Sequence, residues 1–284
     1  MSEARRAPPQ TVVVGAVTED RFGSATRPGG SAPYAARALE ALGIRARILT
    51  SAPPGTAIDA FATHEHTYVS GATTLSFAHD VEGAERRLRV LSTPDRALAA
   101  GDLPSSWRDA DALILAPLLP DDIDIESFAA RSASRIALVA QGLQRQVARD
   151  GVVTLLDEPA AALRAACDER TSVFLSLEEV APWPGGAVED LARLCARVVV
   201  TRGAGGADVY RAGHEVLHVE AAPATPVDTT GAGDAFAAAF TAALTCGATD
   251  ERAGVLAARV AAATVEHVGP VRLPPLATTE GAAR

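Results

Sequence analysis

The stretch DTTGAGDAF, residues 228–236, lies between a turn and a long alanine-rich helical pattern. Its small residues Gly231, Ala232 and Gly233 fall at the expected N-terminus of that helix, where backbone N–H groups and the helix dipole favour a bound anion. Asp234 falls in the first turn of the same helix, so its carboxylate is placed to accept a proton from a hydroxyl beside that anion. The alternative is an ordinary helix start with aspartate as a cap. These nine residues alone leave both interpretations open.

The segments upstream of this stretch alternate between strand and helix patterns. Residues 11–17 (TVVVGAV) form an apolar, β-branched run that is typical of a strand buried on both faces. Residues 31–43 (SAPYAARALEALG) favour a helix that ends at glycine, and residues 45–51 (RARILTS) favour the next strand. This order predicts a parallel α/β layer. The same patterns predict strands over 111–118, 134–140, 171–176 and 196–203, helices over 125–133, 158–169, 187–196, 233–247 and 250–269, and a hairpin over 207–221.

Residues 72–92 interrupt this rhythm. Two alternating runs surround the turn signal DVEG at 80–83, which predicts a β-hairpin. We interpret it as a small β excursion that covers a site. Because no linker or internal repeat divides the sequence, we expect one domain over residues 1–284, with a lid from about residues 18–30 and 70–92.

Composition excludes several classes of protein. Hydrophobic residues make up 48% of the 284 residues, which is enough for a substantial core. The net charge of -9 and the lack of a basic block argue against nucleic acids and anionic membranes as partners. The first apolar run is too short to be a signal or a membrane span, so we expect a cytoplasmic protein. All 26 basic residues are arginine, so the chain carries neither a Walker-type phosphate loop nor a lysine Schiff base.

Five motifs together resemble one protein family. DTTGAGDAF resembles the C-terminal signature of the ribokinase-like (PfkB-type) carbohydrate kinases. VVVGAVTED (12–20), RPGGSAPYAARALEALG (27–43), LSLEEV (175–180) and VVVTRGAGGADVY (198–210) resemble further motifs of that family, in the family's order. The resemblance implies a ribokinase-like three-layer α/β/α sandwich with a mostly parallel central sheet and a small β lid.

The resemblance also implies how the phosphoryl-transfer side of the site works, with ATP and Mg²⁺ as cofactors. Asp234 would deprotonate the hydroxyl of the substrate, and the backbone amides of Gly231 to Gly233 would hold the transferred γ-phosphoryl. Glu179 would place magnesium through a water molecule. The ATP site would be lined by Thr201, Gly203, Gly206 and Thr230.

On the acceptor side, the resemblance implies that Asp20, at the end of the first strand, binds substrate hydroxyls. The Gly-Gly motif corresponds to Gly29 and Gly30. Tyr34 stands where many members have an asparagine that contacts the sugar, so we expect a different pattern of hydroxyls to be recognised. Ser176 likewise replaces the asparagine of the N-x-x-E motif, which weakens the magnesium assignment.

A further resemblance concerns the substrate. Gln141 and Arg145 match a Q-x-x-x-R segment of the inositol-kinase-like branch. Arg145 would neutralise the transferred phosphoryl or bind an anion of the substrate, while its alternative is a surface arginine after a strand. The segment 51–66 is shorter and less regular than the corresponding α/β unit of the family. The sequence leaves open whether the protein forms a homodimer.

We therefore expect a kinase that phosphorylates a hydroxyl of a sugar, a polyol or a related small molecule with ATP. A nucleoside kinase of the same family is one alternative, and a non-catalytic sugar- or nucleotide-binding regulatory homologue is another. A dinucleotide oxidoreductase is disfavoured, because no G-x-G-x-x-G opens the first strand–helix unit.

Overall fold

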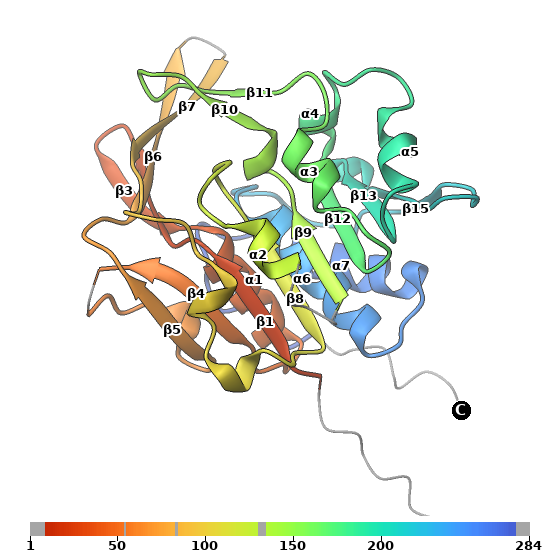
Figure 1. The fold of residues 1–284 in the computed structure, drawn as a ribbon, viewed down its shortest axis with the longest axis horizontal. Coiled ribbons are helices and arrows are strands. Elements are labelled where there is room, and N and C mark those ends of the chain that lie inside the picture. The colour runs from red at the N-terminus through yellow and green to blue at the C-terminus, as the bar shows by residue number, and fades with distance from the viewer. Residues whose placement is uncertain (1–8, 54, 83–84, 130–134, 277–284) are drawn as a thin grey trace, which may run out of the picture.

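A nine-stranded sheet forms the centre of the molecule (Figure 1). The computed structural model describes residues 9–53, 55–82, 85–129 and 135–276. The strands β4, β1, β8, β9, β12 and β13 run parallel, and β14 and β15 close one edge antiparallel. In sheet order the strands are β15 (Leu217–Val219), β14 (Ala207–Tyr210), β13 (Arg197–Thr201), β12 (Thr171–Ser176), β9 (Arg135–Val139), β8 (Ala112–Ala116), β1 (Thr11–Gly15), β4 (Arg47–Ala52) and β5 (Glu65–Ser70).

Apolar side chains of this sheet are buried on both faces, as the continuous apolar runs predict. In β1, Val13 belongs to one core cluster, whereas Val12 and Val14 belong to the other. Since side chains alternate along a strand, each parallel strand contributes to two separate cores. The sheet is therefore the middle layer of three, and the three-layer α/β/α class predicted from the sequence is confirmed.

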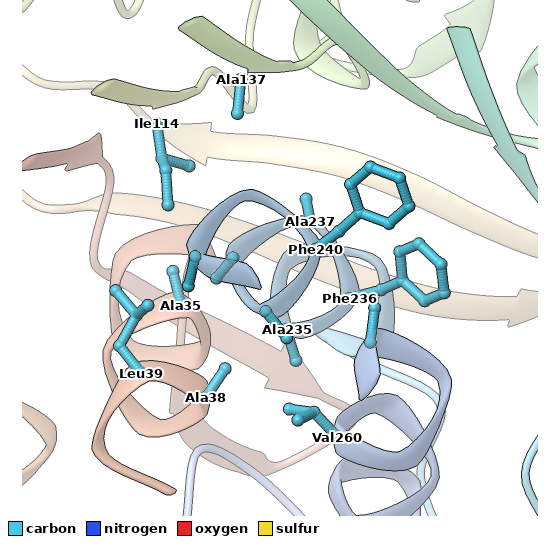
Figure 2. Packing of buried hydrophobic residues seen from close by; sticks show 14 of the residues in the cluster. Ala35, Ala38, Leu39, Ile114, Ala137, Ala235, Phe236, Ala237, Phe240 and Val260 are labelled. Carbon is cyan, nitrogen blue, oxygen red and sulfur yellow. The ribbon is translucent and has the colours of Figure 1, made fainter. Parts of the chain in front are cut away.

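One face of the sheet is covered by α1 (Ser31–Ala41), α6 (Ala232–Thr245) and α7 (Asp250–Val265). Figure 2 shows Ala35 and Ala38 of α1 on the side of that helix toward Ala235 of α6, with Phe236 and Phe240 on the far side of α6. The short alanine side chains let the helices pack closely, and the two aromatic rings fill the space toward the sheet.

The other face is covered by shorter elements, which pack Leu163, Phe128 and Leu191 onto the second core. The helices of this second face are α2 (Ile125–Ala129), α3 (Ala161–Ala165), α4 (Leu177–Val180) and α5 (Ala187–Ala192). Short 3-10 helices lie at Ala100–Asp102, Ser105–Trp107, Gly142–Gln144 and Gly203–Gly205, and a further one at Asp59–Phe61 packs its Ala60 and Phe61 into the first core.

A separate four-stranded sheet stands beside the central one, in the order β3 (Ala25–Gly29), β2 (Thr18–Phe22), β6 (Leu75–Glu82), β7 (Glu85–Ser92). The hairpin predicted over 72–92 is present as β6 and β7. β2 pairs in parallel with β6, which joins two segments that are distant in sequence. The short hairpin of β10 (Arg145–Val147) and β11 (Val153–Leu155) lies next to β7 (Figure 1), where Val90 N donates to Gly151 O at 2.8 Å.

Some elements could not be compared with, or differ from, what the sequence predicts. The predicted helix over 125–133 is described only as far as Ala129, since residues 130–134 lie outside the described part. The strand β5 was not predicted, because its polar and half-buried residues lack an apolar face. Between β4 and β5 the described chain has a 3-10 helix at Asp59–Phe61. Within the described residues, no helix combines the length and the hydropathy needed to cross a membrane.

Candidate active site

The candidate site lies where the parallel strands end. Leu118, Gln141 and Glu179 follow the carboxyl ends of β8, β9 and β12, and Thr201 is the last residue of β13. Because carboxyl ends of parallel strands meet at one edge of a sheet, residues from four distant segments come together there. The N-terminus of α6 completes the site from the helical layer.

Gly231 shapes the start of α6. It is the N-cap and has φ 77, a conformation that favours glycine. A Cβ at this position would lie 2.1 Å from Cγ of Tyr34, so the ring of Tyr34 occupies the space that glycine leaves free. Asp228 holds the preceding turn by accepting from Thr230 N at 3.0 Å and Thr230 Oγ1 at 2.7 Å. The helix begins at Ala232, one residue before the helix predicted over 233–247.

Asp234 lies in the first turn of α6. Removal from water raises the pKa of its carboxyl to about 7, and the nearby Glu179 adds to this rise while Arg145 opposes it. A carboxyl whose pKa lies near neutrality is suited to general base catalysis at physiological pH. The geometry thus joins a helix N-terminus, which favours an anion, to a carboxyl that can take up a proton.

Arg145 is the cationic centre of the site. Its Nη1 donates to Leu118 O at 2.7 Å, and its guanidinium stands 5.6 Å from the ring centroid of Phe77. Burial lowers its pKa. The carboxylates of Glu179, Asp122, Asp234 and Asp20 raise it, in decreasing order of effect. Arg145 therefore lies among four carboxylates from four different segments, rather than at the surface after a strand.

Asp20 does not end the first strand, contrary to the sequence expectation. β1 ends at Gly15, and Asp20 lies in the middle of β2 in the small sheet. Its side chain is buried, and Oδ1 has no hydrogen-bond partner among the described residues. Burial raises the pKa of this carboxyl to about 6, while Thr18 and Arg145 lower it. A Cβ at Gly29 would lie 2.6 Å from Asp20 Oδ2, so glycine makes room for the carboxylate.

Gly30 and Tyr34 connect the small sheet to α1. Gly30 has φ 103, and a Cβ there would lie 2.3 Å from Ala16 O. Tyr34 is buried, and this burial raises the pKa of its phenol. Asp228, Asp234 and Asp20 raise that pKa further, in this order. The phenol of Tyr34 thus lies within electrostatic range of both the helix-start aspartate and the small-sheet aspartate.

Glu179 belongs to a capping box at the start of α4. Its N–H donates to Ser176 Oγ at 3.3 Å, and its Oε2 accepts from Ser176 N at 2.7 Å. Ser176 therefore has a local role that the sequence did not reveal. The pKa of the Glu179 carboxyl is raised by burial and lowered by its Ser176, Arg145 and Gln141 neighbours. In the described part of the chain, no group of three or more His, Cys, Asp or Glu side chains could hold a metal ion.

A cleft of about 410 Å³ opens beside the N-terminus of α6. One wall comes from the segment after β13, where Gly206 has φ 80 and a Cβ would lie 2.0 Å from Val219 O. Thr229 lines the cleft, whereas Thr230, which we expected there, points its hydroxyl to Asp228. The lining is mostly small and apolar: Thr201, Gly203, Ala204, Gly206, Ala221, Ala222, Pro223, Ala224, Pro226, Thr229, Ala232, Gly233, Phe236, Ala258, Ala261, Ala262 and Val265.

Three residues of this neighbourhood were missed from the sequence. Asp228 was quoted as part of the motif without a role, and Arg27 lies opposite Asp20 in the β2–β3 pair. Asp122 follows β8 in the acidic run DDID, which resembles a solvated loop. Its burial depends on the packing of the loop and on no local pattern.

The fold and the arrangement of these residues resemble those expected of a small-molecule kinase, and the chain was compared with known proteins. The profile of the pfkB family carbohydrate kinases matches residues 143–276. An inositol 3-kinase from Zea mays is 31% identical over 265 residues, which cover 85% of this chain and 66% of the maize protein. The chain thus spans 66% of the length of this curated relative.

Solved structures agree over almost the whole chain. A myo-inositol-1 kinase that depends on pyrophosphate and was converted into a myo-inositol-3 kinase has a TM-score of 0.76 at 17% identity, with 93% of this chain and 95% of that chain covered. A ribokinase from Arabidopsis thaliana complexed with ribose and ATP has a TM-score of 0.73 at 19% identity, with 94% and 96% covered. At such identities the likeness shows the fold.

Residues 143–276 thus match the pfkB family of carbohydrate kinases, and the chain is similar to an inositol 3-kinase over most of its length. These matches support the resemblance to the family and to its inositol-kinase-like branch, which the motifs indicated.

Proposed function

We propose that this protein is a kinase that transfers the γ-phosphoryl of ATP to a hydroxyl of a small neutral polyol, with an inositol as the first candidate. The observation that carries the proposal is the position of Asp234. It lies in the first turn of α6, directly after Ala232 and Gly233, which line the 410 Å³ cleft, and its charge acts on the pKa of Tyr34. A donor bound in the cleft and an acceptor bound beside Tyr34 would meet at the carboxyl of Asp234.

The proposed proton transfer follows from the local physics. Asp234, with a pKa near 7, accepts the proton of the attacking hydroxyl while the oxygen of that hydroxyl forms a bond to the γ-phosphorus. The backbone N–H groups of Gly231 to Gly233 and the positive charge of Arg145 stabilise the charge on the transferred group. The bond between the γ-phosphorus and the oxygen that bridges it to the β-phosphate breaks, and this bridging oxygen leaves with ADP.

The small apolar lining of the cleft supports ATP as the donor. Walls of alanine, proline and valine suit the flat face of a nucleobase, and the cleft runs to the helix start, where phosphates would lie. Pyrophosphate is the second candidate donor, because some similar structures are pyrophosphate-dependent kinases. Pyrophosphate would leave the apolar part of the cleft unused.

Charge on the acceptor side supports a neutral substrate. Asp20 is buried with an unpartnered oxygen that a hydroxyl of the acceptor would satisfy. An acceptor that already carries a phosphate would meet net negative charge here. The charged residues on this side are Asp20, Asp122, Asp228, Asp234 and Glu179, against Arg27 and Arg145.

Magnesium fits the site as a companion of the donor. Glu179 is a buried carboxylate near Arg145 and Asp234, and the described residues offer no preformed cage. Mg²⁺ keeps several waters and binds through one or two carboxylates together with substrate phosphates, which suits a lone Glu179. The ion would neutralise charge on the phosphates of the donor.

Two alternatives stay in competition. A nucleoside kinase of the same family would use the same base, but would bind an aromatic base on the acceptor side. A regulatory homologue would bind a sugar or a nucleotide without turnover, and then the pKa of Asp234 would have no catalytic purpose.

The test is a turnover assay on a matrix of donors and acceptors. ATP and pyrophosphate are each combined with Mg²⁺ and with inositols, pentoses, hexoses, sugar phosphates and nucleosides, and the phosphorylated product is followed by mass spectrometry. We expect turnover with ATP and an uncharged polyol. Preference for a nucleoside selects the first alternative, and binding without turnover on the whole panel selects the second.

A further inference from the structure

A buried carboxylate outside the expected motifs lies behind Arg145. Asp122 belongs to the loop between β8 and α2 and is 9% exposed. Its Oδ2 accepts from Leu118 N at 2.8 Å, and Oδ1 has no hydrogen-bond partner within the described part of the chain. A buried carboxylate with an unused oxygen costs free energy, so its presence calls for a physical explanation.

The hydrogen bonds of Asp122 lead through one residue to the catalytic centre. Leu118 is that residue, because its carbonyl oxygen accepts from Arg145 Nη1 at 2.7 Å while its N–H donates to Asp122 Oδ2. Asp122 thus holds the residue whose carbonyl in turn holds the guanidinium.

The same peptide segment is supported from its other side. Gly142 N donates to Pro117 O at 3.0 Å, and a Cβ at Gly142 would lie 2.6 Å from the Pro117 carbonyl carbon. The turn that carries Arg145 therefore packs directly on the segment that Asp122 anchors. Leu118 and Leu119 pack with Phe77 in one hydrophobic cluster. The guanidinium of Arg145 stands over the ring of Phe77.

This arrangement leaves the charge of Arg145 available. Its hydrogen bond runs to a neutral carbonyl, while the carboxylates act on its pKa through electrostatics. A guanidinium held by a direct bidentate carboxylate would be largely neutralised and less able to interact with a phosphoryl group. Orientation by a carbonyl keeps the cation in place beside Asp234 without consuming its charge.

We propose that Asp122 is a positioning residue for Arg145, acting through Leu118. The inference rests on the proposed function, in which Arg145 interacts with the transferred phosphoryl. Asp122 itself touches neither substrate nor donor, and the hydrogen bond it accepts matters more than its charge. The distinction is testable because asparagine keeps a carbonyl oxygen for Leu118 N–H and removes the charge.

The experiment compares Asp122→Ala, Asp122→Asn and a matched control, Asp121→Asn, at the neighbouring exposed carboxylate. We expect Asp122→Ala to lower kcat about 10- to 100-fold, the range of a displacement near 1 Å, with the KM for ATP within about 2-fold of wild type. Asp122→Asn retains most of kcat, and Asp121→Asn behaves as wild type. Thermal unfolding of each variant shows whether it is folded.

A double-mutant cycle with Arg145→Gln tests the route. If Asp122 acts through Arg145, Asp122→Ala lowers kcat little further in the Arg145→Gln background. Equal losses in both backgrounds overturn the proposal, as does an Asp122→Asn variant as slow as Asp122→Ala.

Crystal structures of the two Asp122 variants provide a readout that is independent of turnover. The guanidinium should leave Leu118 O in Asp122→Ala and keep it in Asp122→Asn, and an unmoved guanidinium in the alanine variant overturns the proposal. A wild-type protein with no turnover on any acceptor would contradict the proposed function, while these structures still decide the positioning role.

Discussion

The ring of Tyr34 packs against Gly231 so closely that a Cβ at position 231 would lie 2.1 Å from its Cγ. One residue opens α1 on the acceptor side, and the other starts α6 at the phosphoryl-binding end. The contact fixes the distance between the two halves of the site. Tyr34 therefore has a structural contact that its position in the Gly-Gly motif does not indicate: its ring sets how closely α1 approaches the start of α6.

Gly231→Ala should destabilise the protein by about 1–3 kcal/mol, the usual cost of overpacking, and more where the positive φ adds strain. Gly233→Ala is the matched control for stability, since a Cβ there meets nothing within 4 Å. Chemical denaturation of both variants checks this, and equal losses at the two positions would contradict the packing argument.

Asp234→Asn should lower kcat by about 10²–10⁴-fold, because asparagine cannot take up the proton of the hydroxyl. Binding of ATP, measured by calorimetry, should stay near that of wild type, since the helix start is unchanged. A variant that keeps most of its turnover would remove Asp234 from the role of base.

The pH dependence of stability should differ between the wild type and Asp234→Asn. Burial raises the pKa of Asp234 to about 7, so the folded protein binds this proton more tightly than the unfolded chain, where aspartate has a pKa of about 3.9. This contribution to stability is present below about pH 4 and is lost as the pH rises toward 7.

At pH 8 the folded wild type must bury an ionised carboxyl, which costs free energy, whereas the asparagine of Asp234→Asn is neutral at every pH. The variant should therefore melt higher than the wild type at pH 8, by on the order of a few °C. The difference should shrink at pH 5, where the folded wild type carries a protonated Asp234. Differential scanning calorimetry at both pH values measures it. A difference that is equal at pH 5 and pH 8, or of opposite sign at pH 8, would show that the carboxyl is not strained by burial.

Tyr34→Asn should change which acceptor is used more than it changes the KM for ATP. Asparagine leaves a gap against Gly231 and offers an amide where the phenol stood. The ratio of kcat/KM values across the polyol panel measures the change, with Tyr34→Phe separating the hydroxyl from the ring. An unchanged acceptor profile in Tyr34→Asn would exclude Tyr34 from substrate selection.

The helix start at DTTGAGDAF could be predicted because its signals are local. Small residues, an alanine-rich run and an early aspartate specify α6 from Ala232 onward, and the structure agrees. The 72–92 hairpin and the buried parallel strands could likewise be predicted from the pattern of apolar side chains along the chain.

Other parts of the site depend on tertiary packing that periodicity does not report. Asp20 was expected to end the first strand because the segment VVVGAVTED resembles that motif of the family, whereas β1 ends at Gly15 and a separate strand, β2, carries Asp20. The burial of Asp122 arises from the fold of the loop after β8. Thr230 was expected in the nucleotide cleft, but its hydroxyl is used by Asp228 within a turn.

The parallel pairing of β2 with β6 has a consequence for how the molecule assembles. The β2–β3 ribbon is made early in synthesis, but an isolated two-stranded ribbon is marginal in water. It gains its neighbour only after the chain has passed residue 82, so this sheet depends on a contact of long sequence separation, which forms slowly. Asp20 therefore reaches its buried position late, and the acceptor side of the site is completed after the first strands of the central sheet have been made.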